Sequence, residues 1–151
     1  FLILTPCRPQ KLQNKLDLLD KVSIITCNKD ESQKLFNTND IISCVKKYPN
    51  KLIVTLGADG LVYYDGFEII KIPSVCVEEV VDTVGAGDTL NGNLASALSQ
   101  GDTLKQALKR AMYATALKIQ KKTAQAGMPY KEELEKYMLE KDSSKVLARK
   151  K

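Results

Sequence analysis

The sequence predicts an α/β fold whose mainly parallel sheet ends in antiparallel strands. Apolar runs at 1–5 and 22–26 enclose a segment with leucines at helical spacing, which is the pattern of a βαβ unit. A third apolar run at 51–56 precedes two β-rich runs joined through Asp65 and Gly66, a strong hairpin signal. Most of the rest of the chain carries apolar residues three or four positions apart, as amphipathic helices do.

The first half of the chain is expected to alternate strands with helices. In order, we expect a strand at 1–5, a helix carrying Leu12, Leu16 and Leu19, a strand at 22–26, helices at 29–36 and around 41–45, a strand at 51–56, a turn at 57–60, and strands at 61–64 and 67–72. Asn28 or Thr26 can cap the helix at 29–36, whose first turn carries carboxylates where the helix dipole favours anions.

The second half is expected to be helical apart from two irregular stretches. In order, we expect irregular chain at 73–84, a helix opened by 85–88 and closed by Gln100 and Gly101, a helix capped by Asp102 or Thr103, a loop at 121–129, a helix at 130–140, and a frayed lysine-rich tail at 141–151. No repeat or low-complexity linker divides the chain, so we expect one α/β unit.

Composition argues against several classes of protein. The net charge of +5 comes largely from the tail at 141–151, which lacks the interleaved aromatic residues of a nucleic-acid surface. Four dispersed cysteines and no histidine disfavour a structural zinc site. Cys27 and Cys76 have apolar neighbours and are expected to be small buried thiols in a reducing compartment. The apolar opening is too short for a membrane span, so we expect a cytoplasmic protein without membrane or nucleic-acid partners.

The segment 82–88, with the sequence DTVGAGD, carries the clearest chemical signal. Its glycines let a ligand approach the backbone, and successive N–H groups at a helix start favour a phosphate. Asp88 could then accept a proton from a hydroxyl held in line with a nucleotide's terminal phosphate. A tight turn with Asp88 as a helix cap would explain a bare Gly-x-Gly-Asp better, but six specified residues in seven positions arise by chance at about 10⁻⁷ to 10⁻⁸.

This segment, continued through Thr89, resembles the second signature of the ribokinase-like carbohydrate kinases, also called the phosphofructokinase B family. Residues 28–31 resemble that family's Asn-x-x-Glu motif, and 54–60 resemble its nucleotide-contacting strand and turn. Residues 124–130 resemble the loop before its final helix. The resemblance extends to about Tyr137 and implies a three-layer ribokinase-like fold, with 1–140 as the C-terminal nucleotide-binding and catalytic part.

The resemblance also implies roles for individual residues. Asp88 would be the general base, and the N–H groups of Gly85, Ala86 and Gly87 would stabilise the transferring phosphoryl group. ATP would be bound by four residues: Asn28, Thr55, Gly57 and Gly60. Glu31 with Asn28 would hold hydrated Mg²⁺, although alone these two read as a helix cap and a first-turn carboxylate. Asp82 and Val84 would bind a monovalent cation, K⁺, that orders the anion hole.

The chain departs from the family pattern at three positions. Thr123 stands where glycine is usual in the loop, and Gly127 stands where a serine hydroxyl is usual. Both changes argue against activation by potassium. Met112 replaces an asparagine that commonly lies near the adenine, so the contacts to the base are expected to differ.

The implied activity is ATP-dependent transfer of the γ-phosphate to a primary hydroxyl of a sugar, with D-ribose converted to ribose 5-phosphate. Fructokinase or nucleoside kinase specificity within the family is an alternative. Family members are about twice as long and carry the sugar-binding residues and a dimer-forming lid in the N-terminal half. A catalytically incomplete nucleotide-binding fragment is therefore the competing hypothesis, and we expect the isolated chain to bind nucleotide with little turnover. A dinucleotide-binding fold is disfavoured because a third glycine is missing.

Overall fold

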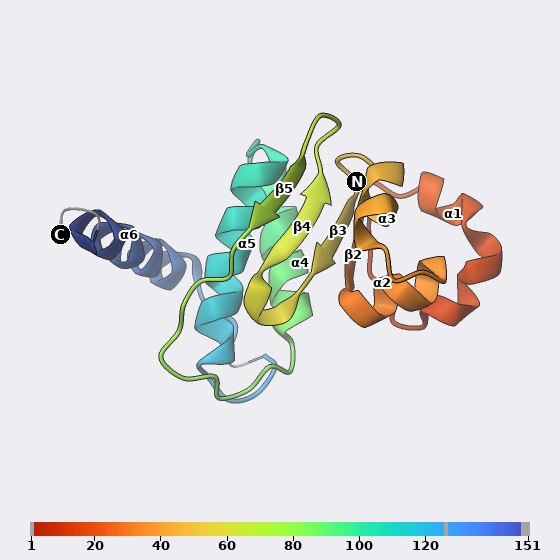
Figure 1. Ribbon diagram of the computed structural model, residues 1–151. Coiled ribbons are helices and arrows are strands. Elements are labelled where there is room, and N and C mark those ends of the chain that lie inside the picture. The colour runs from red at the N-terminus through yellow and green to blue at the C-terminus, as the bar shows by residue number, and fades with distance from the viewer. Residues whose placement is uncertain (1, 126, 149–151) are drawn as a thin grey trace. The chain divides into compact units, whose positions relative to one another are not determined.

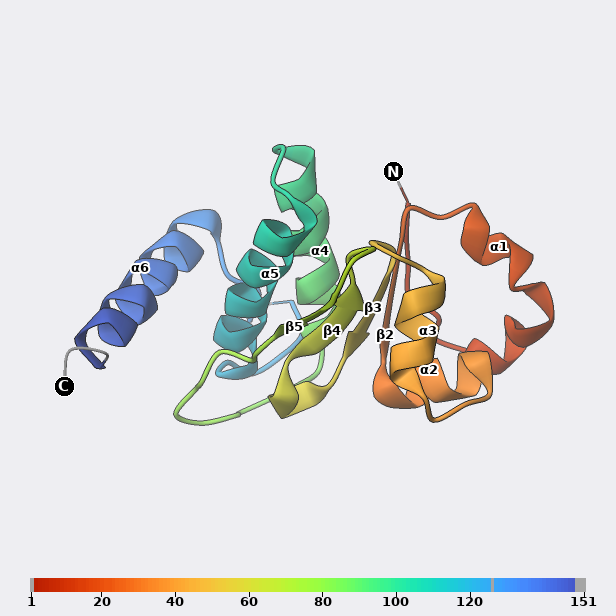
Figure 2. The ribbon, with the colours of Figure 1, turned by 45° about the horizontal axis from the view of Figure 1, so that its top comes forward.

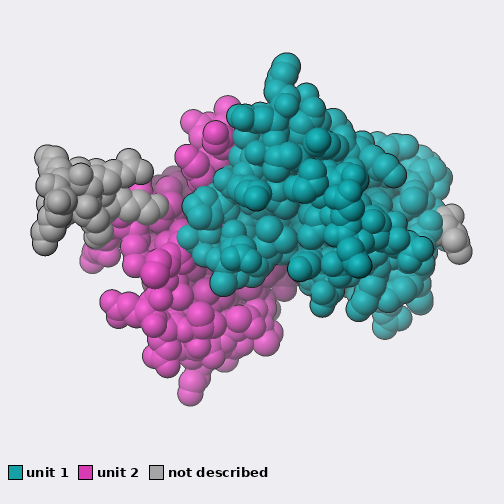
Figure 3. All heavy atoms as spheres, in the orientation of Figure 1, with its two compact units in different colours: residues 1–74 teal, residues 75–151 magenta. Residues whose placement is uncertain are grey.

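The structure, a computed structural model, describes residues 2–125 and 127–148 (Figure 1). The chain divides into two compact units, Phe1–Ser74 and Val75–Lys151 (Figure 3). The division falls in the irregular stretch that was expected after the hairpin. All strands of the sheet belong to the first unit, and helices α4 to α6 belong to the second.

The first unit is built on a five-stranded sheet with the strands in sequence order. The strands are β1 (Ile3–Leu4), β2 (Ile24–Asn28), β3 (Leu52–Thr55), β4 (Leu61–Tyr64) and β5 (Ile69–Ile72). The first three are parallel, and β3, β4 and β5 pair antiparallel, as the sequence predicts. Strand β2 pairs Asn28 with Thr55 of β3, so these two residues lie side by side at the carboxyl ends of parallel strands.

Helices α2 (Lys29–Phe36) and α3 (Ile41–Lys47) lie against β2, β3 and β4 and cover one face of this sheet (Figure 2). Their apolar stripes meet the sheet in one core, since Leu35, Val45 and Leu52 are all almost completely buried. Asn28 caps α2 rather than Thr26, and α3 is capped by the Asp40 side chain.

The segment between β1 and β2 differs from its expectation. In place of one helix through Leu12, Leu16 and Leu19, there are two 3-10 turns, Pro9–Lys11 and Gln13–Lys15, and a one-turn helix α1 (Asp17–Asp20). Only Leu19 is fully buried, whereas Leu16 is 37% exposed. A stripe that does not bury a continuous face gives a helix little tertiary support, and short helices need that support.

The hairpin of β4 and β5 is closed by Asp65 and Gly66. The Asp65 carboxylate accepts hydrogen bonds from the N–H groups of Phe67 and Glu68, both at 2.8 Å. This local turn holds Phe67 outside the sheet with 93% of its surface exposed, so β5 begins at Ile69 rather than at residue 67.

The second unit contains α4 (Ala86–Ser99), α5 (Leu104–Ile119) and α6 (Lys131–Ala148). Thr103, not Asp102, caps α5 through a capping box with Gln106. Helices α5 and α6 share a small core around Tyr113, Leu117 and Leu134. Helix α6 continues past residue 140, where the sequence pattern predicts its end, to Ala148.

All four cysteines are free. Cys27 is buried, as expected, and burial raises the pKa of its thiol to about 12. The expectation for Cys76 is wrong, since this residue is exposed in the irregular stretch before α4. In the part of the chain that the structure describes, no helix combines the length and apolarity that crossing a membrane requires.

Candidate active site

The start of α4 is shaped by a glycine in a left-handed conformation. Gly85 precedes the helix with φ +80°, and a Cβ built on it would lie 3.1 Å from the Cβ of Ala124. Thr89, which is buried, donates both its N–H and its hydroxyl to the Gly85 carbonyl at 2.9 Å. Thr89 therefore fixes the Gly85 carbonyl while Ala124 lies close to the Gly85 Cα, and a side chain at position 85 would be strained.

This turn leaves open N–H groups at the helix start, as the first turn of an α-helix does. The Ala86 N–H donates to the Thr83 carbonyl at 3.1 Å, so the prediction that it belongs to the anion hole is not supported. Among the described residues, the N–H groups of Gly85, Gly87 and Asp88 have no hydrogen-bond acceptor. Nothing lies within 4 Å of a Cβ built on Gly87, which leaves room for a ligand. The candidate anion site thus consists of Gly85, Gly87 and Asp88.

Asp88 lies in the first turn of α4 and is exposed. The helix has no side-chain cap, and within the described residues the Asp88 carboxylate has no hydrogen-bond or ion-pair partner. The alternative in which Asp88 caps its own helix is therefore not what the structure shows. An exposed carboxylate beside open N–H groups can accept a proton from a hydroxyl brought close to a bound phosphate.

Asp82 connects the segment before α4 to the loop after α5. Its carboxylate accepts the N–H of Val84 at 2.9 Å and the N–H of Thr123 at 3.0 Å, with one oxygen for each. Its main-chain carbonyl accepts the Lys118 ammonium at 3.1 Å. The hydrogen bond from Val84, followed by that from Thr123 and by the charge of Lys118, lowers the pKa of the Asp82 carboxyl against the opposing effect of desolvation.

These contacts bear on the monovalent cation that the resemblance implies at Asp82 and Val84. The Lys118 ammonium already lies 3.1 Å from the Asp82 carbonyl oxygen, and its positive charge would repel a second cation at that oxygen. Both carboxylate oxygens of Asp82 in addition face N–H donors. The residues present therefore do not fit a bound K⁺.

The predicted residues of the first unit lie at the carboxyl ends of β2 and β3. Asn28 and Glu31 form a reciprocal capping box, with hydrogen bonds of 2.8 and 2.9 Å. The Thr55 hydroxyl is directed at the carbonyl of Cys27 at 3.4 Å. Ligands in α/β proteins commonly bind at this edge of a sheet.

A magnesium site is compatible with this edge only through bound water. No group of three or more histidine, cysteine, aspartate or glutamate residues capable of holding a metal occurs in the described part of the chain. One Glu31 oxygen belongs to the helix cap, and the second lies outside that hydrogen bond. Mg²⁺ keeps several waters and needs only one or two carboxylates, so Glu31 fits a hydrated ion.

The two glycines of the turn after β3 differ in their surroundings. Gly57 is exposed with φ +61°, and a Cβ built on it meets nothing within 4 Å. Gly60 is buried with φ +89°, and its Cβ would lie 2.0 Å from the Ile72 carbonyl oxygen. Gly57 is thus open to a ligand, whereas Gly60 is required by the close approach of two backbone segments. The predicted role of Gly60 in ATP binding has no support in this geometry.

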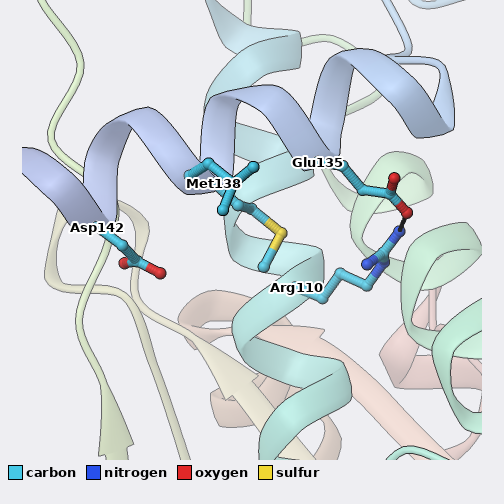
Figure 4. Close-up of a pocket in the computed structure, with 5 residues that line it drawn as sticks. Arg110, Glu135, Met138 and Asp142 are labelled. Carbon is cyan, nitrogen blue, oxygen red and sulfur yellow. Dashed lines mark ion pairs between the residues drawn. The ribbon is translucent and has the colours of Figure 1, made fainter.

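Two hollows lie away from the predicted residues. One of about 370 Å³ lies between α5 and α6, where Arg110 and Glu135 form an ion pair of 3.6 Å (Figure 4). Another, of about 330 Å³, is lined in the first unit by residues that include Phe36, Cys44 and Tyr48. Neither contains a residue that the motifs single out.

Sequence reasoning missed Lys118, although a signal was present. Ala107, Ala111, Ala114 and Lys118 occupy one stripe of α5 at spacings of three and four, and all are buried. A lysine on an otherwise apolar stripe requires a specific partner, because long charged side chains are almost never fully buried without one. The Asp82 carbonyl is such a partner.

A mixed sheet with polar residues at its parallel carboxyl ends is typical of α/β proteins, and a glycine-rich helix start is a common feature of phosphate-binding members of this class. Residues 2–131 match the family described as pfkB family carbohydrate kinase, and the chain belongs to that family. The ribokinase-like fold expected from the resemblance is thereby confirmed, with solved ribokinases as structural neighbours.

Among its curated relatives, the chain is 43% identical over 114 residues to ribokinase of Lactococcus lactis, covering 76% of this chain and 38% of the relative. It is 38% identical over 133 residues to ribokinase of Bacillus subtilis, covering 88% and 44%. The chain thus spans less than half the length of these relatives.

Two solved structures support the same assignment. The structure of ribokinase from Thermotoga maritima aligns with a TM-score of 0.78 at 27% identity, covering 90% of this chain and 48% of that one. Ribokinase from Arabidopsis thaliana, complexed with ribose and ATP, aligns with a TM-score of 0.70 at 29% identity, covering 80% and 42%.

Proposed function

We propose that this chain forms the ATP-binding and catalytic part of a cytoplasmic sugar kinase that transfers the γ-phosphate of ATP to a primary hydroxyl of D-ribose. The observation that carries the proposal is the helix start at Gly85, with its open N–H groups and the unpaired Asp88 carboxylate. Membership of the pfkB family supports a carbohydrate as the acceptor. The names of the relatives and the ribose and ATP of the Arabidopsis structure support ribose as the sugar.

Asp88 acts as the general base in this proposal. It accepts the proton of the sugar hydroxyl as the oxygen attacks the γ-phosphorus, and a positioned base typically contributes about 10² to 10⁴ in rate. The N–H groups of Gly85, Gly87 and Asp88 stabilise the negative charge of the transferring phosphoryl group. Removal of one well-placed donor of this kind costs about 10² to 10³ in turnover.

The first unit contributes nucleotide and metal contacts. Thr55 and Asn28 lie in register at the strand ends, and Gly57 leaves its backbone open to a nucleotide. Glu31 holds the waters of Mg²⁺, which supplies positive charge to the phosphates when bound. The variant Glu31→Gln tests this role separately from the helix cap, because glutamine also completes a capping box. We expect unchanged thermal stability and weaker binding of ATP·Mg by calorimetry, and equal affinities would contradict the metal role.

The activity is tested by two measurements on the protein that carries this chain. Calorimetry measures the binding of ATP·Mg, and a coupled assay measures ADP release with ribose, fructose and adenosine as acceptors. We expect ribose to give the highest kcat/KM. A higher kcat/KM with fructose or adenosine would contradict ribose as the acceptor and would support fructokinase or nucleoside kinase specificity instead. Binding of ATP·Mg without ADP release from any acceptor would support a catalytically incomplete nucleotide-binding chain instead.

The variant Asp88→Asn, with Glu132→Gln as its control, separates the base from a general charge effect. Glu132 is likewise an exposed carboxylate in the first turn of a helix, α6. We expect Asp88→Asn to retain ATP·Mg binding and to lose turnover, whereas Glu132→Gln retains both. Equal turnover of the two variants would exclude Asp88 as the base.

A further inference from the structure

A lysine is completely buried beneath the segment that leads into α4. Lys118 has no exposed surface, and its Nζ lies 3.1 Å from the carbonyl oxygen of Asp82. An ammonium group taken out of water is strongly destabilising unless it is paired and hydrogen-bonded. The Asp82 carbonyl and the negative charge of the same residue supply that pairing.

The loop after α5 approaches this side chain at Gly127. Gly127 is buried, and a Cβ built on it would lie 3.4 Å from the Cε of Lys118 and 2.9 Å from the Thr123 carbonyl oxygen. A side chain at position 127 would therefore collide with the Thr123 carbonyl and come into ordinary contact with the lysine. The glycine thus lets the loop backbone lie close to the lysine side chain.

The lysine also lies between two sets of hydrogen bonds, one at Ile119 and one at Asp82. Ile119, the next residue, accepts the N–H groups of Val81 and Asp82 at 2.7 and 3.1 Å. The Asp82 carboxylate in turn holds the N–H groups of Val84 and Thr123. One end of α5 therefore fixes the backbone immediately before Gly85.

We propose that the Lys118 ammonium serves as a built-in cation that holds Asp82 in place, so that this chain needs no bound monovalent cation there. The Asp82 carboxylate then joins the segment 81–85 to the loop 121–125. Lys118 is a positioning residue: it acts through Asp82 on the turn at Gly85 and does not touch the substrate. What we call the clamp consists of the hydrogen bonds that Asp82 accepts from Lys118, Val84 and Thr123. Its effect on phosphoryl transfer rests on the proposed function.

The Lys118 ammonium can take the place of a monovalent cation because both carry a single positive charge. A lysine ammonium is a compact point charge with three hydrogen-bond donors, and it can satisfy carbonyl oxygens as a small cation does. Because it is tethered to α5, it remains in place at any salt composition. The order of the turn should therefore not depend on potassium.

Hydrogen exchange of the Val84 and Thr123 amides tests the clamp without any substrate. We compare the wild-type chain with Lys118→Met, which keeps most of the volume and removes the charge, and Lys118→Ala, which leaves space. Lys109→Met is the matched control, since Lys109 is an exposed lysine of the same helix. Each protein is measured in potassium chloride and in tetramethylammonium chloride at equal ionic strength, and circular dichroism checks that it is folded.

We expect the wild type and Lys109→Met to show the same protection in both salts. In Lys118→Met the two amides should exchange about ten- to a hundredfold faster, which corresponds to the loss of one hydrogen bond to a charged group. In Lys118→Ala the protection should be lost in tetramethylammonium and partly restored by potassium or methylammonium, which can enter the vacated space.

Two results would overturn the proposal: greater protection of the wild type in potassium than in tetramethylammonium, or protection in Lys118→Met equal to that in Lys109→Met. If Lys118→Met does not fold, the wild-type salt comparison still decides. A failure of ADP release would count against the proposed kinase activity and leave the exchange results unaffected. The two proposals can therefore fail separately.

Discussion

Alanine substitutions at Gly85 and Gly87 should change stability in opposite directions, although the two glycines are only two residues apart. Gly85 has φ +80°, and its Cβ would approach Ala124 to 3.1 Å. A left-handed conformation costs an L-residue about 1–2 kcal/mol. For a chain of this length, 1 kcal/mol corresponds to roughly 2–4 °C in Tm. Gly85→Ala should therefore lower Tm by about 2–8 °C.

Gly87 lies inside the first turn of α4, and a Cβ built on it meets nothing within 4 Å. In a helix, alanine is more stable than glycine by about 0.5–1 kcal/mol. Gly87→Ala should raise Tm by about 1–4 °C. The added methyl group would nevertheless occupy the space left for a phosphate, so binding of ATP·Mg should weaken.

The assay is a thermal melt followed by circular dichroism, with calorimetry of ATP·Mg on the same samples. A gain in stability combined with a loss of affinity is the signature of a glycine kept for ligand approach. If Gly87→Ala lowered Tm as much as Gly85→Ala, this result would contradict the claim that position 87 has open space for a side chain. Unchanged affinity in Gly87→Ala would contradict the phosphate site.

Gly60→Ala should destabilise the first unit far more than Gly57→Ala, because only the Cβ at position 60 collides with the Ile72 carbonyl; equal denaturant midpoints of the two variants would refute this. Thiol labelling of the native protein at pH 8 should modify Cys76 and spare Cys27, whose pKa of about 12 keeps it protonated, and early labelling of Cys27 would contradict its burial. Since this pKa is raised in the folded state, the thiol's contribution to stability is complete below its unfolded pKa and is lost as pH rises toward 12, which urea melts from pH 7 to 11 would detect.

Sequence patterns correctly predicted the elements that depend on residues close together in the chain. The β-branched runs and the Asp65 and Gly66 turn gave the order and direction of β3, β4 and β5 because hairpin geometry depends on neighbouring residues. The capping box of Asn28 and Glu31 likewise depends on residues three apart. The sequence left Thr26 open as the cap, and the structure decides for Asn28.

The features that sequence reasoning did not find depend on tertiary contacts. Leu16 has the spacing of a helical core residue, but it is only partly buried, and the expected helix is broken. The Ala86 N–H matches the motif yet closes a local turn with Thr83. The pairing of Lys118 with Asp82 spans 36 residues, a distance at which spacing carries no information.

The central claim is that the Asp88 carboxylate accepts the proton of a sugar hydroxyl at the start of α4. Its most direct test is the turnover of Asp88→Asn relative to wild type in ADP release with ribose and ATP, measured in the protein that carries this chain. We predict a fall in kcat of about 10² to 10⁴ with ATP·Mg affinity unchanged or improved, since a like charge beside the phosphate has been removed. A kcat within a few-fold of the wild type would contradict the claim.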